Sequence, residues 1–146
     1  MDKKDVRVQI QQMQAEMQAL IQSAKKDQLR FVTLSCAKIE RTAKSIMRDS
    51  PTNPDVTYGK KGHHPSYAGN PPAPDNGTLL QSVTHSFDVD VSGNVKGYVG
   101  SILKNPDYPR FLEYGTSRMK PRPWLSASLI KCQTFMGNLF REIFGK

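Results

Sequence analysis

The sequence contains few cysteines and no long apolar run. Cys36 and Cys132 are the two cysteines among 146 residues, and they lie far apart on apolar helical stripes. This spacing predicts buried free thiols in a reducing cytoplasm rather than a disulfide framework. No stretch approaches the roughly 20 apolar residues that a membrane span needs, and the charged, glutamine-rich start is unlike a secretory signal. We therefore expect neither a membrane-spanning nor a secreted protein.

The residue patterns of common catalytic sites are also missing. The sequence shows no nucleophile elbow, no pair of carboxylates at a useful spacing and no constellation of metal ligands. The adjacent His63 and His64 have no partner at ligand spacing, and residues 59–62 lack the length of a phosphate-binding loop. We expect no catalytic residue, no metal and no cofactor, with a small hydrolase or nuclease as a minor alternative.

Acidic residues are scarce relative to basic ones. The chain carries 21 lysines and arginines against 13 aspartates and glutamates, which gives a net charge of +8 and a pI near 9.6. This balance attracts polyanions or acidic protein surfaces, and composition does not choose between them. Basic strands interleaved with aromatic residues and a recognition helix are both missing. A nucleic-acid-binding module is therefore the alternative to the main interpretation given below.

Proline and glycine are absent before Pro51, which predicts a long N-terminal helix. Its two apolar stripes differ in phase near residues 25–27, so one helix with a stutter and two helices with a break both fit. A continuous helix of about 40 residues would be about 60 Å long and would exceed the domain body. Residues 1–28 are therefore expected to project as an arm whose Met13, Met17 and Leu20 pack on a neighbouring subunit. A frayed helical tail is the alternative.

Residues 29–146 are expected to form a single α+β domain. A loop at residues 50–78 is rich in proline and glycine, and loops of this length are usually functional or disordered. Alternating apolar residues at 83–91 predict a half-buried strand, and residues 95–102 complete an antiparallel hairpin, the basis of a small sheet. His85 is expected to be packed and hydrogen-bonded. Gly97 and Gly100 indicate close packing beneath a helix.

The end of the chain predicts a short helix before Gly115 and a C-terminal helix packed on the sheet. Glycine takes the left-handed conformation that a helix end often needs. The inner face of the C-terminal helix is expected to comprise Leu125, Leu129, Cys132, Met136, Leu139 and Ile143. Ile130, Phe140 and Phe144 widen this face. Core packing explains most of this width, and the excess at Phe140 and Phe144 is also consistent with a contact to another subunit.

A basic loop joins these two helices, and its alternating Arg118, Lys120 and Arg122 would project to one side of an extended chain. Prolines stiffen it. We expect Glu113 to fix the loop through a salt bridge with an arginine, Arg122 to be partly buried against Glu113 and Trp124, and Arg118 and Lys120 to be exposed. The candidate interaction loop comprises Glu113, Gly115, Thr116, Arg118, Met119, Lys120, Arg122, Pro123 and Trp124.

Two composite motifs combine the basic loop and the long loop with the segments that flank them. The first joins a tyrosine, an aliphatic-Glu-aromatic-Gly-Thr run and an Arg-Pro-aromatic-aliphatic run. It consists here of Tyr108, Leu112-Glu113-Tyr114-Gly115-Thr116-Ser117, Met119 and Arg122-Pro123-Trp124-Leu125. The second is a Ser/Gly/Pro-Pro loop that leads into Gly-x-Leu-x-x-Ser-aliphatic. It consists here of His64-Pro65-Ser66, Gly69, Pro71-Pro72 and Gly77-Thr78-Leu79-Leu80-Gln81-Ser82-Val83.

Both motifs resemble those of the tail-completion (neck, minor tail) proteins of tailed bacteriophages. They cover about half of the chain, with two departures from the family pattern. Asn76-Gly77-Thr78 replaces the family's Thr-Gly before the leucine, and Pro109 replaces the small residue after the tyrosine. The resemblance implies a structural virion protein without enzymatic activity, which joins tail to head in a ring-like oligomer around the DNA path. It implies residence in the neck or upper tail, and in the host cytoplasm during assembly. The implied partners are further copies of this chain, the head–tail connector and tail proteins. The resemblance also allows non-specific contact with DNA in the lumen of the ring.

Overall fold

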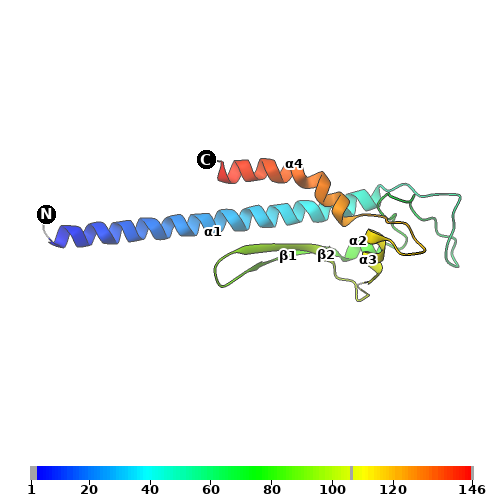
Figure 1. Cartoon of the computed structure of the whole chain (residues 1–146), viewed down its shortest axis with the longest axis horizontal. Helices are drawn as coiled ribbons and strands as arrows, with labels where there is room; N and C mark the ends of the chain where they lie inside the picture. Colours follow the sequence, from blue (N-terminus) through cyan, green and yellow to red (C-terminus); the bar gives the residue numbers. More distant parts are fainter. Residues whose placement is uncertain (1–2, 106, 146) are drawn as a thin grey trace.

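The computed structural model describes residues 3–105 and 107–145 and confirms the predicted α+β fold (Figure 1). A long helix, a two-stranded antiparallel sheet, two short helices and a C-terminal helix follow one another along the chain. These elements are α1 (Lys3–Arg48), α2 (Thr78–Ser82), β1 (Val83–Val89), β2 (Val95–Ser101), α3 (Asp107–Tyr114) and α4 (Leu125–Phe144).

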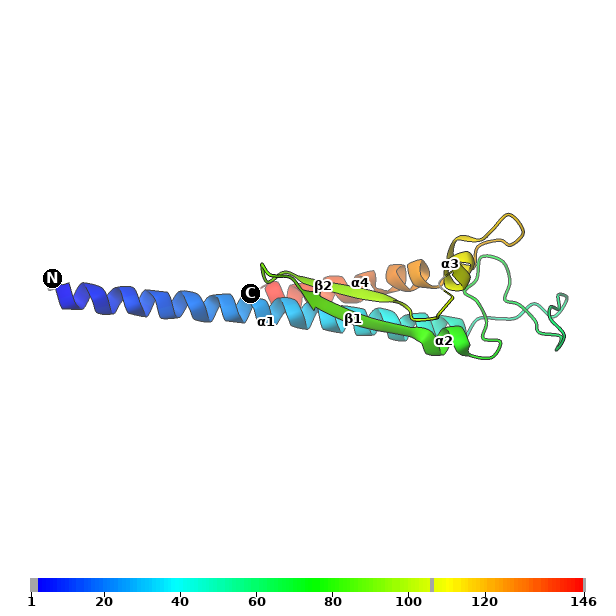
Figure 2. The same cartoon turned by 90° about the horizontal axis from the view of Figure 1, so that it is seen from below.

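α1 is one continuous helix of 46 residues. Strong helix formers such as glutamine, alanine, methionine and lysine fill it, and no proline or glycine interrupts it. At 1.5 Å per residue it is about 70 Å long. Its first half extends beyond every other element in two perpendicular views (Figures 1 and 2). Of the two arrangements that the sequence left open, the unbroken helix is the one found.

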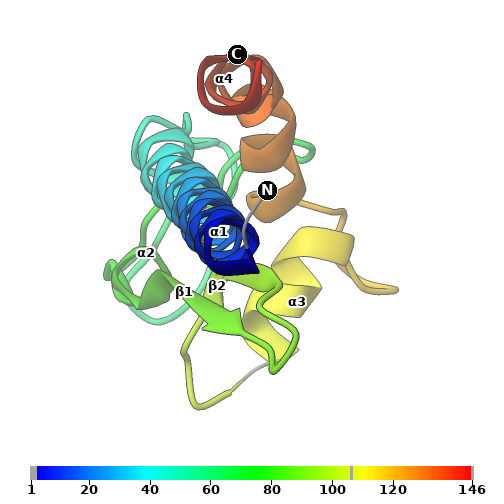
Figure 3. The ribbon, with the colours of Figure 1, turned by 90° about the vertical axis from the view of Figure 1, so that its left-hand side faces the viewer.

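α4 and the hairpin lie on different sides of α1 (Figure 3). α4 runs antiparallel to α1, because Cys132 near its start donates to Thr42 at 3.3 Å, whereas Glu142 near its end accepts from Arg30 at 3.1 Å. The end of α4 also approaches the hairpin. The groove there is lined by Gln28, Phe31, Val32, Asn94, Val95, Phe140 and Phe144.

Gly97 allows the hairpin to approach α1 closely. It pairs with Phe87 in the antiparallel register, and a Cβ atom at this position would overlap the side chains of Cys36 and Val32. The expectation of close packing beneath a helix is therefore confirmed for Gly97. It is wrong for Gly100, where a Cβ atom would meet open space.

The outer half of the hairpin is more exposed than the alternating pattern predicts. Val83 is buried, whereas Phe87 and Val89 are each 49% exposed. The prediction that alternate residues of this strand are buried is thus wrong beyond His85. A two-stranded ribbon rests here against a single helix, which covers only part of its inner face.

The core forms where the end of α1 meets α2, β1, α3 and the start of α4. Its buried members are Ala43, Met47, Leu79, Val83, Leu112 and Trp124. Cys36 and Cys132 are buried free thiols, as predicted, and burial raises the pKa of Cys36. The predicted inner face of α4 needs one correction, because Leu129 is 45% exposed and Ser128 is fully buried instead. The small side chain of Ser128 suits the close approach of α4 to the body.

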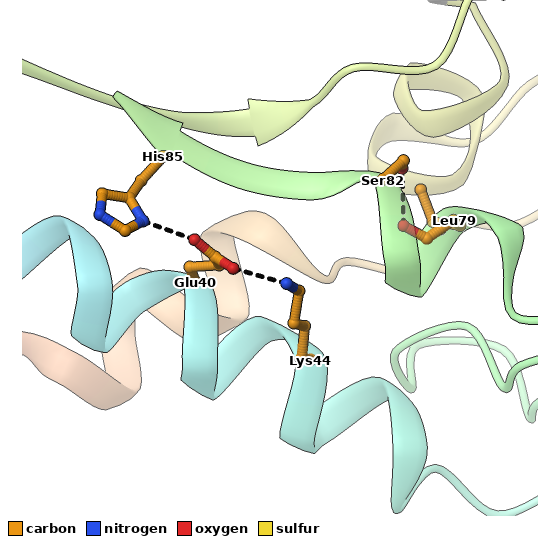
Figure 4. Close-up of polar contacts among 5 residues, drawn as sticks. All are labelled: Glu40, Lys44, Leu79, Ser82 and His85. Carbon is orange, nitrogen blue, oxygen red and sulfur yellow. Dashed lines mark hydrogen bonds and ion pairs between the residues drawn. The ribbon is translucent and has the colours of Figure 1, made fainter. Parts of the chain in front are cut away.

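A polar bridge holds the hairpin to α1 (Figure 4). Glu40 accepts from Lys44 at 2.5 Å through one carboxylate oxygen and lies 2.5 Å from His85 Nδ1 through the other. His85 is thus hydrogen-bonded, as predicted from the sequence. Beside it, Ser82 donates to the carbonyl of Leu79 at 2.6 Å and closes α2 as the chain enters β1.

Replacing Glu40 with glutamine is expected to reduce the acid sensitivity of the fold. The hydrogen bond from Lys44 and then that from His85 hold the pKa of Glu40 below its ordinary value of 4.5, against the opposing effect of burial. Because this pKa is lower in the folded chain, the stabilisation is complete above the unfolded value and is lost as pH falls through the folded value.

Urea unfolding of both proteins at neutral pH and near pH 3 would measure this effect, and the two free energies should converge in acid. Glu142→Gln is the matched control, since its ion pair with Arg30 is exposed and contributes little. A Glu40→Gln deficit of the same size at both pH values would contradict the expectation.

Candidate functional site

The corner between α3 and α4 is built on Gly115. Its φ of 76° lies in the left-handed region, and its N–H donates to the carbonyl of Phe111 at 2.8 Å, which ends α3 as predicted. Thr116 then pairs with Met119 in a tight turn, with the Thr116 N–H 2.8 Å from the Met119 carbonyl. This turn folds back onto the glycine, so a Cβ atom there would lie 2.7 Å from the Met119 oxygen and 2.9 Å from Pro121.

Glu113 caps the start of α4. One oxygen accepts the N–H groups of Trp124 at 2.8 Å and Leu125 at 2.9 Å, and the other accepts that of Ser126 at 2.9 Å. The first N–H groups of a helix have no partner within the helix, and its N-terminus favours negative charge. Burial raises the pKa of Glu113, but the hydrogen bonds from residues 124–126 together outweigh it and leave the pKa below its ordinary value.

The predicted salt bridge of Glu113 is therefore wrong. Within the described part of the chain, none of the ion pairs involves this carboxylate. Sequence reasoning placed Glu113 beside arginines because these are its neighbours along the chain. The structure instead uses the carboxylate for backbone donors, which are closer and more numerous.

Arg122 ties the basic loop to the long loop that precedes α2. Its Nε donates to the carbonyl of Ser66 at 3.2 Å, and its backbone N–H donates to Leu112 at 2.7 Å. Gly69 adds a hydrogen bond at 3.0 Å to the carbonyl of Pro121. The predicted partial burial of Arg122 is confirmed, but its side-chain hydrogen bond is to Ser66 and not to Glu113.

Trp124 belongs to the core rather than to an exposed docking surface. It is 3% exposed, and its indole N–H donates to the carbonyl of Pro109 at 3.2 Å. Pro123 beside it is half-buried. Arg118 and Lys120 are exposed, as predicted. Arg118 and Lys120 are therefore the exposed cations of the loop, whereas Glu113, Gly115 and Arg122 hold the corner in place.

An apolar groove of about 280 Å³ lies beside the basic loop. The corner contributes Tyr108, Leu112, Met119 and Arg122 to its lining, and the long loop contributes Val56, Tyr58, Pro65, Ser66, Pro72 and Ala73. Sequence analysis did not assign a site to the long-loop residues, although the second family motif overlaps them. Ser66 Oγ is buried and has no hydrogen-bond partner within the described chain.

The long loop is ordered by its own pairing. Thr52 bridges to Ser66 and Tyr58 bridges to His63. His63 Nδ1 also lies 2.5 Å from a carboxylate oxygen of Asp75. These contacts show that the described loop is ordered, and its functional role remains a prediction. Burial raises the pKa of both groove tyrosines, and the nearby Asp75 carboxylate raises it further.

The predicted site residues fall on three separate surfaces. The corner lies at one end of the molecule, while Met13, Met17 and Leu20 lie on the free half of α1 toward the other end (Figure 1). Phe140 and Phe144 lie between them, where both pack against Phe31 with ring centroids 5.8 and 6.0 Å apart. Subunit contacts by the arm and by the end of α4 remain predictions.

Among the described residues, no three histidine, cysteine or acidic side chains lie close enough together to hold a metal ion. No helix of this part combines the length and apolar character required to cross a membrane. Comparisons with protein-family models, with curated proteins and with solved structures each gave no match. The geometry and the sequence motifs therefore carry the functional argument.

Proposed function

We propose that this chain is a structural virion protein of a tailed bacteriophage, a neck or tail-completion component that joins tail to head. In this proposal it acts in a ring-like oligomer around the DNA path and performs no reaction. It assembles in the host cytoplasm and resides in the neck or upper tail. The observation that carries the proposal is the corner, where the family-like motif forms a rigid turn that presents two cations beside an apolar groove.

The corner suits docking because its geometry is fixed before a partner arrives. Glu113, Gly115 and Arg122 hold the turn through backbone hydrogen bonds and close packing. Arg118 and Lys120 flank Met119, whose side chain lines the groove. A partner with an apolar side chain for the groove and carboxylates for the two cations complements this surface. Preorganisation lowers the entropy lost on binding.

Replacing Arg118 and Lys120 with alanine is expected to leave the fold intact and to lower the yield of tailed particles at least about tenfold. Both side chains are exposed, so their loss costs little stability. The yield is measured by electron microscopy when the variant is the sole source of the protein. Arg41→Ala with Lys131→Ala removes the same charge elsewhere on exposed surface and serves as the control. Normal yields from the corner variant would refute docking through this loop.

A nucleic-acid-binding module is the second candidate, favoured by the net charge of +8. Binding that depends on phosphate contacts weakens steeply as salt rises. Salt-sensitive retention of the isolated monomer on duplex DNA, lost in the Arg118/Lys120 variant, would favour this candidate. Retention that is absent at physiological salt favours the structural role.

A further inference from the structure

The free half of α1 carries an apolar stripe that the rest of the described chain leaves uncovered. Its members alternate at spacings of four and three residues, and they are Val6, Ile10, Met13, Met17, Leu20 and Ala24. Met13, Met17 and Leu20 are 61%, 59% and 71% exposed. A period of 3.5 residues keeps one face of a helix against a second helix that supercoils with it. The stripe therefore fits a helical partner.

α4 already covers the same face of α1 further along the helix. Phe31 lies one heptad beyond the stripe and packs edge-on against Phe140 and Phe144. Lys38 lies one heptad further and stands 5.4 Å from the ring centre of Phe135. α4 ends beside Phe31, and the free half of α1 continues past that end (Figure 1). A helix placed on the stripe would lie in line with α4.

We propose that the arms of two copies of this chain pair as an antiparallel two-helix coiled coil. This inference goes beyond the proposed function, because it uses neither the corner nor the groove. The occupant of the stripe is the same stripe on a second copy, related by a two-fold axis.

The stripe is symmetric about residue 15, as such an axis requires. The residue numbers of the three facing pairs each add up to 30. These pairs are Val6 with Ala24, Ile10 with Leu20, and Met13 with Met17. In a two-fold interface residue i contacts residue j while j contacts i. Each of the three pairs therefore occurs twice in the dimer, and every apolar residue of the stripe faces an apolar residue of the other copy.

Charge also favours a second copy over an acidic partner. Glu16 is the one charged residue between residues 8 and 24, in a chain whose net charge is +8. A strongly basic arm would repel its own copy, whereas these glutamine-rich flanks do not. An acidic partner protein would be matched by lysine or arginine along the stripe. Arg7 beside Val6 is the one such residue between Val6 and Ala24, so the central part of the stripe offers none.

The position of α4 selects the antiparallel orientation. A parallel second helix would meet the end of α4 near Phe31, because α4 occupies the same face from that point on. An antiparallel arm brings its own N-terminus to about residue 27 of the first copy and stops short of α4. The body of the second copy then lies beyond the N-terminus of the first.

Cysteine cross-linking distinguishes the two orientations. Cys36 and Cys132 are buried, so an introduced cysteine is the exposed thiol of the native chain. Antiparallel pairing predicts a covalent dimer when Met13→Cys is mixed with Met17→Cys, and little from either variant alone. In this arrangement residue 13 of one copy and residue 13 of the other are offset by about 6 Å along the axis, and the same holds for residue 17. This offset places each identical pair out of disulfide reach. Efficient cross-linking of either variant alone would overturn the antiparallel arrangement.

Sedimentation of the full chain over a range of concentrations tests the pairing itself. Wild type is expected to form a concentration-dependent dimer, and Met13→Glu with Met17→Glu to weaken it about a hundredfold, because charge would be buried in the seam. Gln11→Glu with Gln22→Glu adds the same charge on the opposite face and should leave the dimer intact. A wild-type chain that stays monomeric, or equal loss in both variants, would overturn the proposal.

Glu16 supplies an independent check. In the antiparallel register the two Glu16 side chains face each other across the axis, whereas in a parallel register Glu16 faces Ile21. Glu16→Gln is therefore expected to strengthen the dimer by a few-fold, with the largest gain at low salt. An unchanged dissociation constant would contradict the register. None of these arm variants alters the corner, so particle assembly and arm pairing can fail separately.

Discussion

Replacing Glu113 with alanine is expected to lower the free energy of unfolding by about 3 kcal/mol and the melting temperature by about 10 °C. The carboxylate accepts three backbone N–H groups at the start of α4, and alanine leaves all three without it. Loss of a helix cap alone costs about 1 kcal/mol. The additional cost arises because the Trp124 N–H lies in a buried setting where water cannot replace the carboxylate.

Glu113→Gln is the matched control for the cap. Its amide oxygen can still accept hydrogen bonds, so about half of the stabilisation that Glu113 contributes should remain. A salt bridge would instead lose its whole contribution with the charge and would weaken in high salt. Thermal unfolding of the two variants at low and high salt separates these cases. An alanine variant as stable as wild type would contradict the capping role.

Replacing Gly115 with alanine is the second large effect, and we expect it to cost about 2–4 kcal/mol. The positive φ disfavours any L-residue with a Cβ atom, and this Cβ would lie 2.7 Å from a backbone oxygen of the basic loop. Relief of that contact would move the turn away from α3. The variant should therefore lose the arrangement of Arg118 and Lys120 together with its stability, and particle assembly should fail.

Gly137→Ala is the control for Gly115. Gly137 lies within α4, and a Cβ atom there would meet only the end of Arg141, at 3.8 Å. Alanine in a helix interior is favoured over glycine by about 1 kcal/mol, so this variant should be as stable as wild type or more so. Chemical denaturation measures both. Equal stability of Gly115→Ala and wild type would show that α3 does not end in a left-handed residue.

Much of the fold follows from local patterns. The absence of proline and glycine before Pro51 predicts α1, and the alternation after Val83 together with the Ser-Gly-Asn turn predicts the hairpin. Gly115 marks the end of α3 because a single residue type suits its backbone conformation. The exposure of Arg118 and Lys120 also follows from sequence, since long charged side chains on a stiff loop rarely find a buried partner.

The hydrogen-bond partners of the site residues could not be predicted from local sequence patterns. Glu113 has arginines as neighbours in sequence, yet it caps α4 eleven to thirteen residues away. Arg122 bonds to Ser66, a separation of 56 residues, and both residues line the groove. The burial of Ser128 in place of Leu129 depends on how α4 is rotated against α1.

The sequence did not predict the short helix α2, but by itself it determined the long helix α1, the hairpin, α3 and α4, and where the uncovered apolar stripe and the two exposed cations of the basic loop lie. It did so because backbone preference and periodicity act between residues a few positions apart. Only the tertiary structure decided which carboxylate meets which donor, which half of the hairpin is covered, and that α4 ends where the arm begins. Those outcomes depend on contacts between segments distant in the chain, and no local pattern encodes the rotation and distance at which they meet.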